Sequence, residues 1–170
     1  DVVLKRPVPG GQGTLGERLA LLTNSLREKV ALGRLAVQAV PTGQSGWVSS
    51  YVHFNRKVGA LVQLAWNGPG APATPPENVG HEVCLQVVSR PPTAVRREDV
   101  PADVVERERR IQSETEDLQK KPEAVRGKIV EGRISKWFQE ICLLEQPWVK
   151  DDKQSIATLL AKVGGGRLSI

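Results

Sequence analysis

The sequence predicts an α+β fold, in which helices pack on a small antiparallel sheet and an antiparallel helical hairpin, a short coiled coil, protrudes. Short strand-like runs follow one another between residues 35 and 66, and residues 101–144 then hold two charge-rich segments with helical spacing. Lys121-Pro122 divides these two segments, because proline cannot continue one helix but suits the first turn of the next. With 170 residues, 39% of them hydrophobic, the chain is long enough for about one domain with a core.

The first 40 residues predict a loose start, one helix and one strand. Residues 1–13 end in a run rich in Pro and Gly, which indicates a flexible lead-in. Thr14 and Glu17 have the spacing of a capping box, so a helix should begin here and end near Gly33. Leu35–Val40 is rich in strand-forming residues and is followed by a turn, which favours a short strand. The apolar face of the helix consists of Leu15, Leu19, Leu22, Leu26 and Val30.

Two further strands and a helix should complete the body of the fold. Residues 47–54 alternate loosely and residues 58–66 form a nearly continuous apolar run, so both predict strands. Asn55-Arg56-Lys57 joins them as the tip of a hairpin. Residues 67–76 are rich in Pro and Gly and predict a long loop. A helix should follow over residues 77–89, before a pair of prolines stops it.

The hairpin segments carry narrow apolar stripes with charge on their other faces. Such narrow stripes fit two helices that face each other, but they leave apolar side chains exposed at the edges, which favours contact with another molecule. Their apolar residues are therefore candidates for self-association or for contact with a larger assembly. The first segment contributes Val104, Ile111 and Leu118, and the second Ile134, Phe138 and Ile141.

The remaining residues should return to the body of the fold. Asp151 or Asp152 is expected to cap a last helix that ends at three consecutive glycines, residues 164–166. We therefore divide the chain into a lead-in, a core subdomain, a hairpin, and a return segment with the terminal helix that completes the core. Their boundaries are 1–13, 14–100, 101–144 and 145–170.

No residue pattern in the chain indicates an enzyme, a cofactor or a metal ion. The two histidines fall in different elements, and Cys142 lies among apolar residues, so it is expected to be a buried structural thiol. His53 lies beside the predicted hairpin tip, where partner contact and an ordinary half-buried histidine are both open. His81 is expected to be a plain helix-surface residue. The two distant cysteines argue against a disulfide or zinc framework and for a reducing compartment.

The charge pattern argues against direct nucleic-acid binding, and the length of the apolar runs argues against a membrane protein. The net charge is +5, but aromatic residues make up only 4% and the densest basic cluster alternates with glutamates, as on a solvated helix face. Apolar runs are too short for a membrane span. The first residue is Asp1 and no signal-like segment follows it, which indicates a processed chain or a fragment that is not secreted.

Several motifs resemble translation elongation factor Ts. Residues 129–152, with Val-Glu-Gly-Arg followed by Leu-Leu-Glu-Gln-Pro-Trp-Val, are similar to that family's most specific block, although Trp148 replaces its usual Phe. Residues 98–109 and Lys121-Pro122-Glu123 resemble the entry and the tip of its coiled coil. Ser50-Tyr51-Val52-His53 resembles its strand-and-turn motif. The resemblance extends over roughly residues 15–163.

The resemblance implies a protein that binds elongation factor Tu and expels GDP so that GTP can reload, without a catalytic side chain or a cofactor. Tyr51 and His53 match the family's partner-facing motif, so the resemblance implies that they contact the partner. Arg56 is assigned to the same contact only because of its position in the turn. The family's Thr-Asp-Phe-Val element, which disturbs the magnesium site of its partner, has no counterpart in this sequence. Two functions therefore stay open: an exchange factor seen in part, or a descendant kept as a structural or ribosome-associated component. The compartment implied is the bacterial cytoplasm or the matrix or stroma of an organelle.

Overall fold

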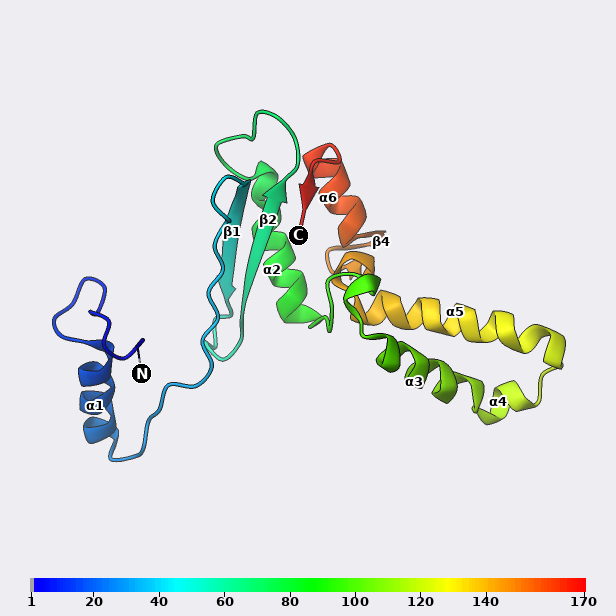
Figure 1. Cartoon of the computed structure of the whole chain (residues 1–170), viewed down its shortest axis with the longest axis horizontal. Helices are drawn as coiled ribbons and strands as arrows, with labels where there is room; N and C mark the ends of the chain where they lie inside the picture. Colours follow the sequence, from blue (N-terminus) through cyan, green and yellow to red (C-terminus); the bar gives the residue numbers. More distant parts are fainter. Residues whose placement is uncertain (1) are drawn as a thin grey trace. The chain divides into compact units, whose positions relative to one another are not determined.

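A computed structural model describes residues 2–170, apart from the side chain of Glu77. By its internal contacts the chain divides into two compact units, residues 1–37 and 38–170, and each is described by itself. The model confirms the α+β fold, because helices accompany a small antiparallel sheet (Figure 1). No helix in the described part of the chain is long and apolar enough to cross a membrane.

The first unit is built around α1 (Leu15–Leu26), and its predicted start is confirmed. The Thr14 N–H donates to Glu17 Oε2 at 2.7 Å, and the Glu17 N–H donates to Thr14 Oγ1 at 3.2 Å, which completes the capping box. The helix ends earlier than the expected Gly33, because Arg27 takes a left-handed conformation with φ +54°. None of its residues is buried in the unit.

The strand expected at Leu35–Val40 is wrong. No strand pairing involves these residues in the described structure, and residues 31–39 are all exposed. A composition rich in Val and Leu favours an extended chain, but a strand also needs a partner edge for its backbone groups. The boundary between the two units falls within this segment.

The sheet of the second unit is formed mainly by β1 (Ser45–Val52) and β2 (Gly59–Trp66). They pair antiparallel along their whole length, from Ser45 opposite Trp66 to Val52 opposite Gly59. The two predicted strands and the turn between them are thus confirmed, with the first shifted by two residues. A short strand, β5 (Leu168–Ser169), pairs with the end of β2.

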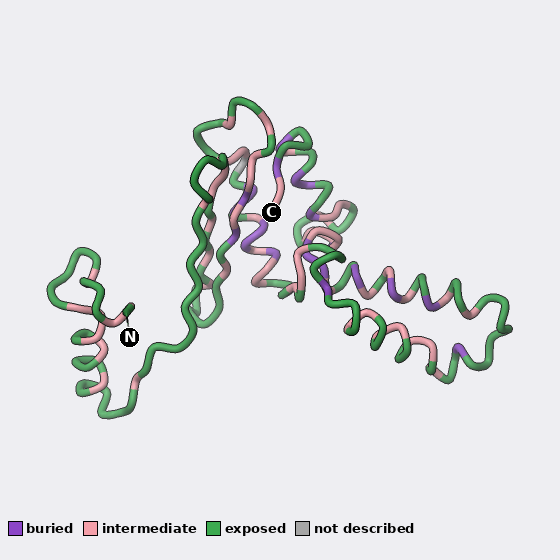
Figure 2. Tube along the Cα trace, in the orientation of Figure 1, coloured by how far each residue is buried: buried purple, intermediate pink, exposed green. Residues whose placement is uncertain are grey.

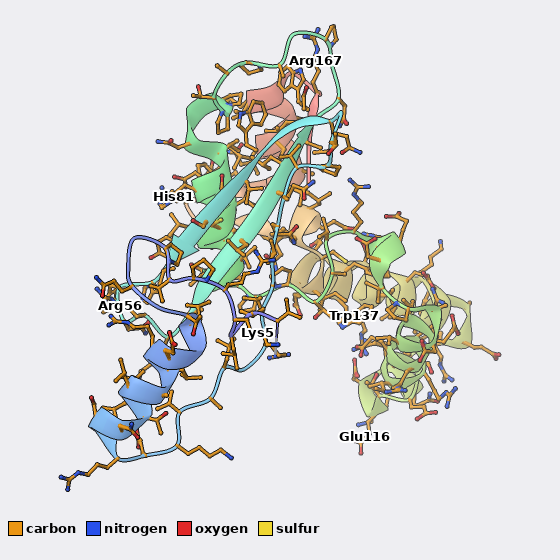
Figure 3. The ribbon with its side chains drawn as sticks, turned by 60° about the vertical axis from the view of Figure 1, so that its left-hand side comes forward. Lys5, Arg56, His81, Glu116, Trp137 and Arg167 are labelled. Atoms are coloured by element: carbon orange, nitrogen blue, oxygen red, sulfur yellow. The ribbon has the colours of Figure 1, made fainter. Side chains whose placement is uncertain are left out.

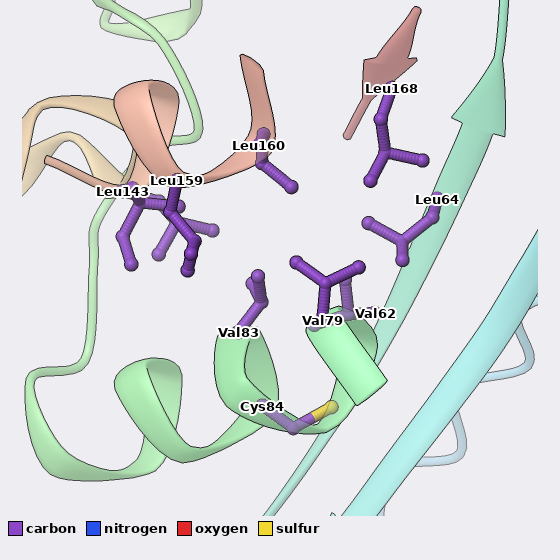
Figure 4. Close-up of a cluster of buried hydrophobic side chains, with 10 residues drawn as sticks. Val62, Leu64, Val79, Val83, Cys84, Leu143, Leu159, Leu160 and Leu168 are labelled. Atoms are coloured by element: carbon purple, nitrogen blue, oxygen red, sulfur yellow. The ribbon is translucent and has the colours of Figure 1, made fainter. Parts of the chain in front are cut away.

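Helix α2 (Val79–Ser89), preceded by the 3-10 turn η1 (Pro76–Asn78), packs closely on one face of this sheet. A Cβ at Gly80 would lie 1.9 Å from Ser49 Oγ, so only glycine allows this approach. The helix α6 (Ile156–Gly164) covers the same apolar region (Figure 4). We call the buried residues there the core cluster: Val62, Leu64, Val79, Val83, Cys84, Leu143, Ile156, Leu159, Leu160 and Leu168.

The expected cap of the terminal helix is wrong. Asp151 and Asp152 lie in β4 (Asp151–Ser155), which pairs with β3 (Pro147–Trp148). Ser155 caps α6 instead, because its Oγ accepts a hydrogen bond of 3.2 Å from the Thr158 N–H. The helix ends, as expected, in the glycine run, with Gly165 left-handed at φ +58°.

The predicted helical hairpin is present and antiparallel. It consists of α3 (Ala102–Ser113), α4 (Glu116–Gln119) and α5 (Glu123–Ile141), with the 3-10 turns η2 (Arg97–Asp99) and η3 (Leu143–Glu145) at its base. In Figure 1, α3 leads away from the sheet and α5 returns beside it. The first helix is not continuous, since Thr115 is extended at φ −65° and ψ 137° and separates α3 from α4.

The buried residues of the hairpin and its base include three on α5 (Figure 2). We call them the hairpin cluster: Val100, Leu118, Val130, Ile134, Phe138 and Cys142. Helix α3 contributes no buried residue, only half-buried ones. At the base, the Leu143 N–H donates to the Ala94 carbonyl at 2.9 Å, and the Thr93 N–H donates to the Ile141 carbonyl at 2.9 Å. These hydrogen bonds join the C-terminal end of the hairpin to the segment between α2 and η2.

Candidate partner-binding site

The turn between β1 and β2 carries the predicted partner-facing residues, and its backbone is closed by hydrogen bonds. The His53 N–H donates to the Val58 carbonyl at 2.8 Å, and the Arg56 N–H donates to the His53 carbonyl at 2.8 Å. Asn55 Oδ1 accepts from the Lys57 N–H at 2.9 Å, as asparagine side chains do in turns. Arg56 takes a left-handed conformation at φ +56°. The turn thus holds its shape without a partner.

Four aromatic rings run from α2 to this turn. His81 on α2 lies edge-on to Tyr51, with ring centroids 5.4 Å apart. The Tyr51 hydroxyl and His53 Nδ1 share a hydrogen bond of 3.0 Å, and the rings of His53 and Phe54 lie 4.4 Å apart. Each ring therefore positions the next, from a helix that packs on the sheet to a side chain in solvent.

The structure brings Tyr51 and His53 into direct contact and places Arg56 on the same turn. Figure 3 shows Arg56 at the end of the hairpin and His81 on the neighbouring helix. His81 is exposed on the surface of α2, as expected, but the sequence does not predict its ring contact with Tyr51. Their thirty-residue separation becomes a contact only because α2 packs across β1, which no local pattern reveals.

The six residues predicted for the hairpin surface do not share one environment. Leu118, Ile134 and Phe138 are buried, and Val104 and Ile141 are half-buried. Ile111 is 54% exposed. The seven-residue recurrence on the first helix assumed one continuous helix, and the break at Thr115 changes the direction that Leu118 faces.

Ion pairs supplement the apolar contacts of the hairpin. Arg109 contacts Glu131 across the helices at 3.1 Å and Glu106 within α3 at 2.6 Å, and Arg133 pairs with Asp117. The hydrogen bond from Arg133 lowers the pKa of the Asp117 carboxyl below its ordinary value.

A further ion pair lies at the base of the hairpin. Arg97 on η2 pairs with Glu145 on η3, and its guanidinium lies 4.7 Å from the centre of the Phe138 ring. The hydrogen bond with Glu145 raises the pKa of Arg97 further above its ordinary value. The guanidinium therefore stays charged and links the two 3-10 turns through an ion pair and an aromatic face.

Nearly the whole chain matches the model of one known protein family. The family model described as elongation factor TS matches residues 2–169. The chain belongs to the elongation factor Ts family. The match covers both the turn around His53 and the whole helical hairpin.

Curated relatives named elongation factor Ts cover most of this chain. The one from Symbiobacterium thermophilum is 38% identical over 156 residues, which are 91% of this chain and 50% of the relative. That from Anaeromyxobacter dehalogenans is 40% identical over 157 residues, 88% of this chain and 70% of the relative. That from Renibacterium salmoninarum is 44% identical over 140 residues, 79% of this chain and 47% of the relative. The chain thus spans about half to 70% of the length of these elongation factor Ts proteins.

The two cysteines of this elongation factor Ts chain lie inside its two apolar clusters. Cys84 and Cys142 are free and buried, as expected for Cys142, and burial raises the pKa of both thiols. Within residues 2–170, leaving out the side chain of Glu77, no three His, Cys, Asp or Glu residues are placed to hold a metal ion.

Proposed function

We propose that this chain binds elongation factor Tu through the turn around Tyr51 and His53 and so promotes GDP/GTP exchange in translation elongation, as one part of a longer factor. The observation that carries the proposal is the family match over residues 2–169, which includes this turn and the hairpin. The hydrogen bonds of the turn support a contact role, because a preformed surface loses little conformational entropy when it binds.

Exchange on this proposal is a coupling of binding free energies and needs no catalytic group. A protein that binds the nucleotide-free state of its partner more tightly than the GDP-bound state must weaken GDP binding by the same factor. The chain supplies part of that binding free energy. The element that disturbs the magnesium site in this family, Thr-Asp-Phe-Val, is not among these residues, so the chain alone should bind without exchanging.

Two measurements with elongation factor Tu test the proposal. Calorimetry with the nucleotide-free partner should detect binding, and release of fluorescent GDP should keep its rate within error when the chain is in excess. His53→Ala should weaken binding about tenfold, whereas Ser45→Ala, exposed at the other end of β1, should change it less than twofold.

Each outcome has a distinct meaning. Absence of binding by the wild-type chain would overturn the proposed partner. A large acceleration of GDP release would show that the exchange element lies within these residues. Equal weakening by His53→Ala and Ser45→Ala would move the contact away from the turn.

A further inference from the structure

Phe54 is the most exposed large apolar side chain of the β1–β2 turn, at 88%. Its ring lies 4.4 Å from that of His53, and Phe54 belongs neither to the core cluster nor to the hairpin cluster. An exposed phenylalanine contributes nothing to the core, yet large aromatic side chains are the usual anchors of protein interfaces. Contact with another molecule therefore explains the exposure of Phe54 better than the stability of the fold does.

The surroundings of Phe54 fix its position. The residues on either side are held by the backbone hydrogen bonds from His53 to Val58 and from Arg56 to His53, both 2.8 Å long. His53 is held in turn by its 3.0 Å hydrogen bond with Tyr51. A side chain on such a turn is presented at a defined place, so most of the ordering cost of binding is avoided.

Two exposed cations follow Phe54 in the same turn. Neither Arg56 nor Lys57 pairs with a carboxylate among the described side chains. An apolar anchor flanked by positive charge fits an apolar pocket with carboxylates at its rim, since opposite charges guide and orient the encounter.

We propose that Phe54 anchors this chain in such an acidic-rimmed apolar pocket of elongation factor Tu, with Arg56 and Lys57 facing the rim. The inference rests on the proposed function and adds a residue that sets the affinity of that contact. A second copy of this chain fits the turn less well. Among the described grooves, the most apolar one, around Leu19, has no carboxylate in its lining, and the groove that contains Glu140 is also lined by the cations Arg90 and Lys136.

The test compares matched substitutions in the full chain with nucleotide-free elongation factor Tu as the probe. Phe54→Ala should weaken binding at least tenfold, mainly through faster dissociation. Val52→Ala removes another exposed apolar group, 65% exposed and two residues away on β1, and should change binding less than twofold. Phe54→Leu, which keeps apolar bulk, should fall between the wild type and Phe54→Ala.

The charged flank is tested separately by Arg56→Asn, because asparagine tolerates the left-handed backbone at this position. It should weaken binding about threefold at low salt and reduce the dependence of affinity on salt. Equal thermal midpoints for all variants would show that each one folds.

The outcomes separate this inference from the proposed function. If the wild type binds and Phe54→Ala binds equally well, the anchor role is wrong and the proposed partner stands. Equal losses in Phe54→Ala and Val52→Ala would also overturn the anchor. If the wild-type chain does not bind, the proposed partner is wrong and the anchor role fails with it.

Discussion

The core cluster and the hairpin cluster hold the second unit together by different forces. The core cluster gathers side chains from β2, α2, η3, α6 and β5, and Leu64, Val83 and Ile156 within it are fully buried. The hairpin cluster is one-sided, because α3 adds only half-buried residues, and three ion pairs bridge its helices and base. Apolar burial should therefore determine the stability of the core, whereas charge and pH should modulate the stability of the hairpin.

The two clusters can be followed separately because each contains one buried cysteine. Cys84 lies in the core cluster and Cys142 in the hairpin cluster. Burial raises the pKa of both thiols, so both should react slowly with a thiol reagent at neutral pH until their region opens. Their labelling rates therefore report the local opening of each region.

The largest effect is expected in the core. Leu64→Ala removes a side chain with 0% exposure from the centre of the cluster and should lower the free energy of unfolding by about 3 to 4 kcal/mol. Leu61→Ala on the same strand, 46% exposed, is the matched control and should cost less than about 1 kcal/mol. Urea unfolding followed by tryptophan fluorescence measures both. Similar costs at the two positions would contradict a core centred on Leu64.

A smaller and more local effect is expected in the hairpin. Ile134→Ala removes a buried side chain from α5 and should cost about 2 kcal/mol, at the low end for such truncations, because the half-buried seam can close around it. Labelling of Cys142 should then accelerate about 10- to 30-fold, while labelling of Cys84 changes little. Val125→Ala, 40% exposed on the same helix, is the control. Equal acceleration of both thiols would show one cooperative unit instead of two regions.

The pH dependence of the hairpin follows from Asp117. Its pKa is lowered in the folded chain by Arg133, so its contribution is fully present above the ordinary carboxyl value of 3.8 and is lost as the pH falls through the lower folded value. Asp117→Asn should therefore melt at a lower temperature than the wild type at pH 7, by about 1 °C, and the difference should be smaller at pH 2. Helical circular dichroism at both pH values measures this.

Two controls sharpen the pH experiment. Asp152→Asn, an exposed acid of β4 that pairs with no described cation, should leave the difference between pH 7 and pH 2 unchanged. Salt at about 0.5 M should shrink the Asp117 effect, because exposed ion pairs are screened. A pH difference that survives in Asp117→Asn would assign it to another carboxylate.

Local patterns in the sequence predicted elements whose cause is itself local. The capping box at Thr14 and Glu17 marked the start of α1. The loose alternation of residues 47–54 and the apolar run of residues 58–66 marked the two paired strands. Pro122 marked the division of the hairpin, because a missing N–H acts at one position. In each case the deciding interaction lies within a few residues.

The failures have a different origin. Leu35–Val40 has strand composition but no partner edge in the described structure, and Asp151 could not cap α6 because β3 pairs with its segment. The contact between Tyr51 and His81 depends on how α2 packs across the sheet. Each of these outcomes is decided by tertiary pairing, which overrides local propensity.

The smallest effect on stability is expected at Ile111, and it bears on self-association. Of the six residues predicted for that role, Ile111 alone is exposed, at 54%. Ile111→Ala should therefore change the free energy of unfolding by no more than about 0.5 kcal/mol, since truncation at an exposed position leaves no cavity.

If the hairpin associates with a second copy, we expect the contact to include this side chain, because the other five predicted residues are covered in whole or in part within the chain. Sedimentation of the wild type and Ile111→Ala at matched concentrations should then show weaker association for the variant. Glu108→Gln, on the half-buried side of the same helix, serves as a control that keeps Ile111 in place. A wild-type chain that stays monomeric at the highest concentrations would remove self-association from the roles of the hairpin. One isoleucine among the charges of α3 is too small an apolar patch to drive association by itself. The exposed Ile111 would then be available for contact with a different partner.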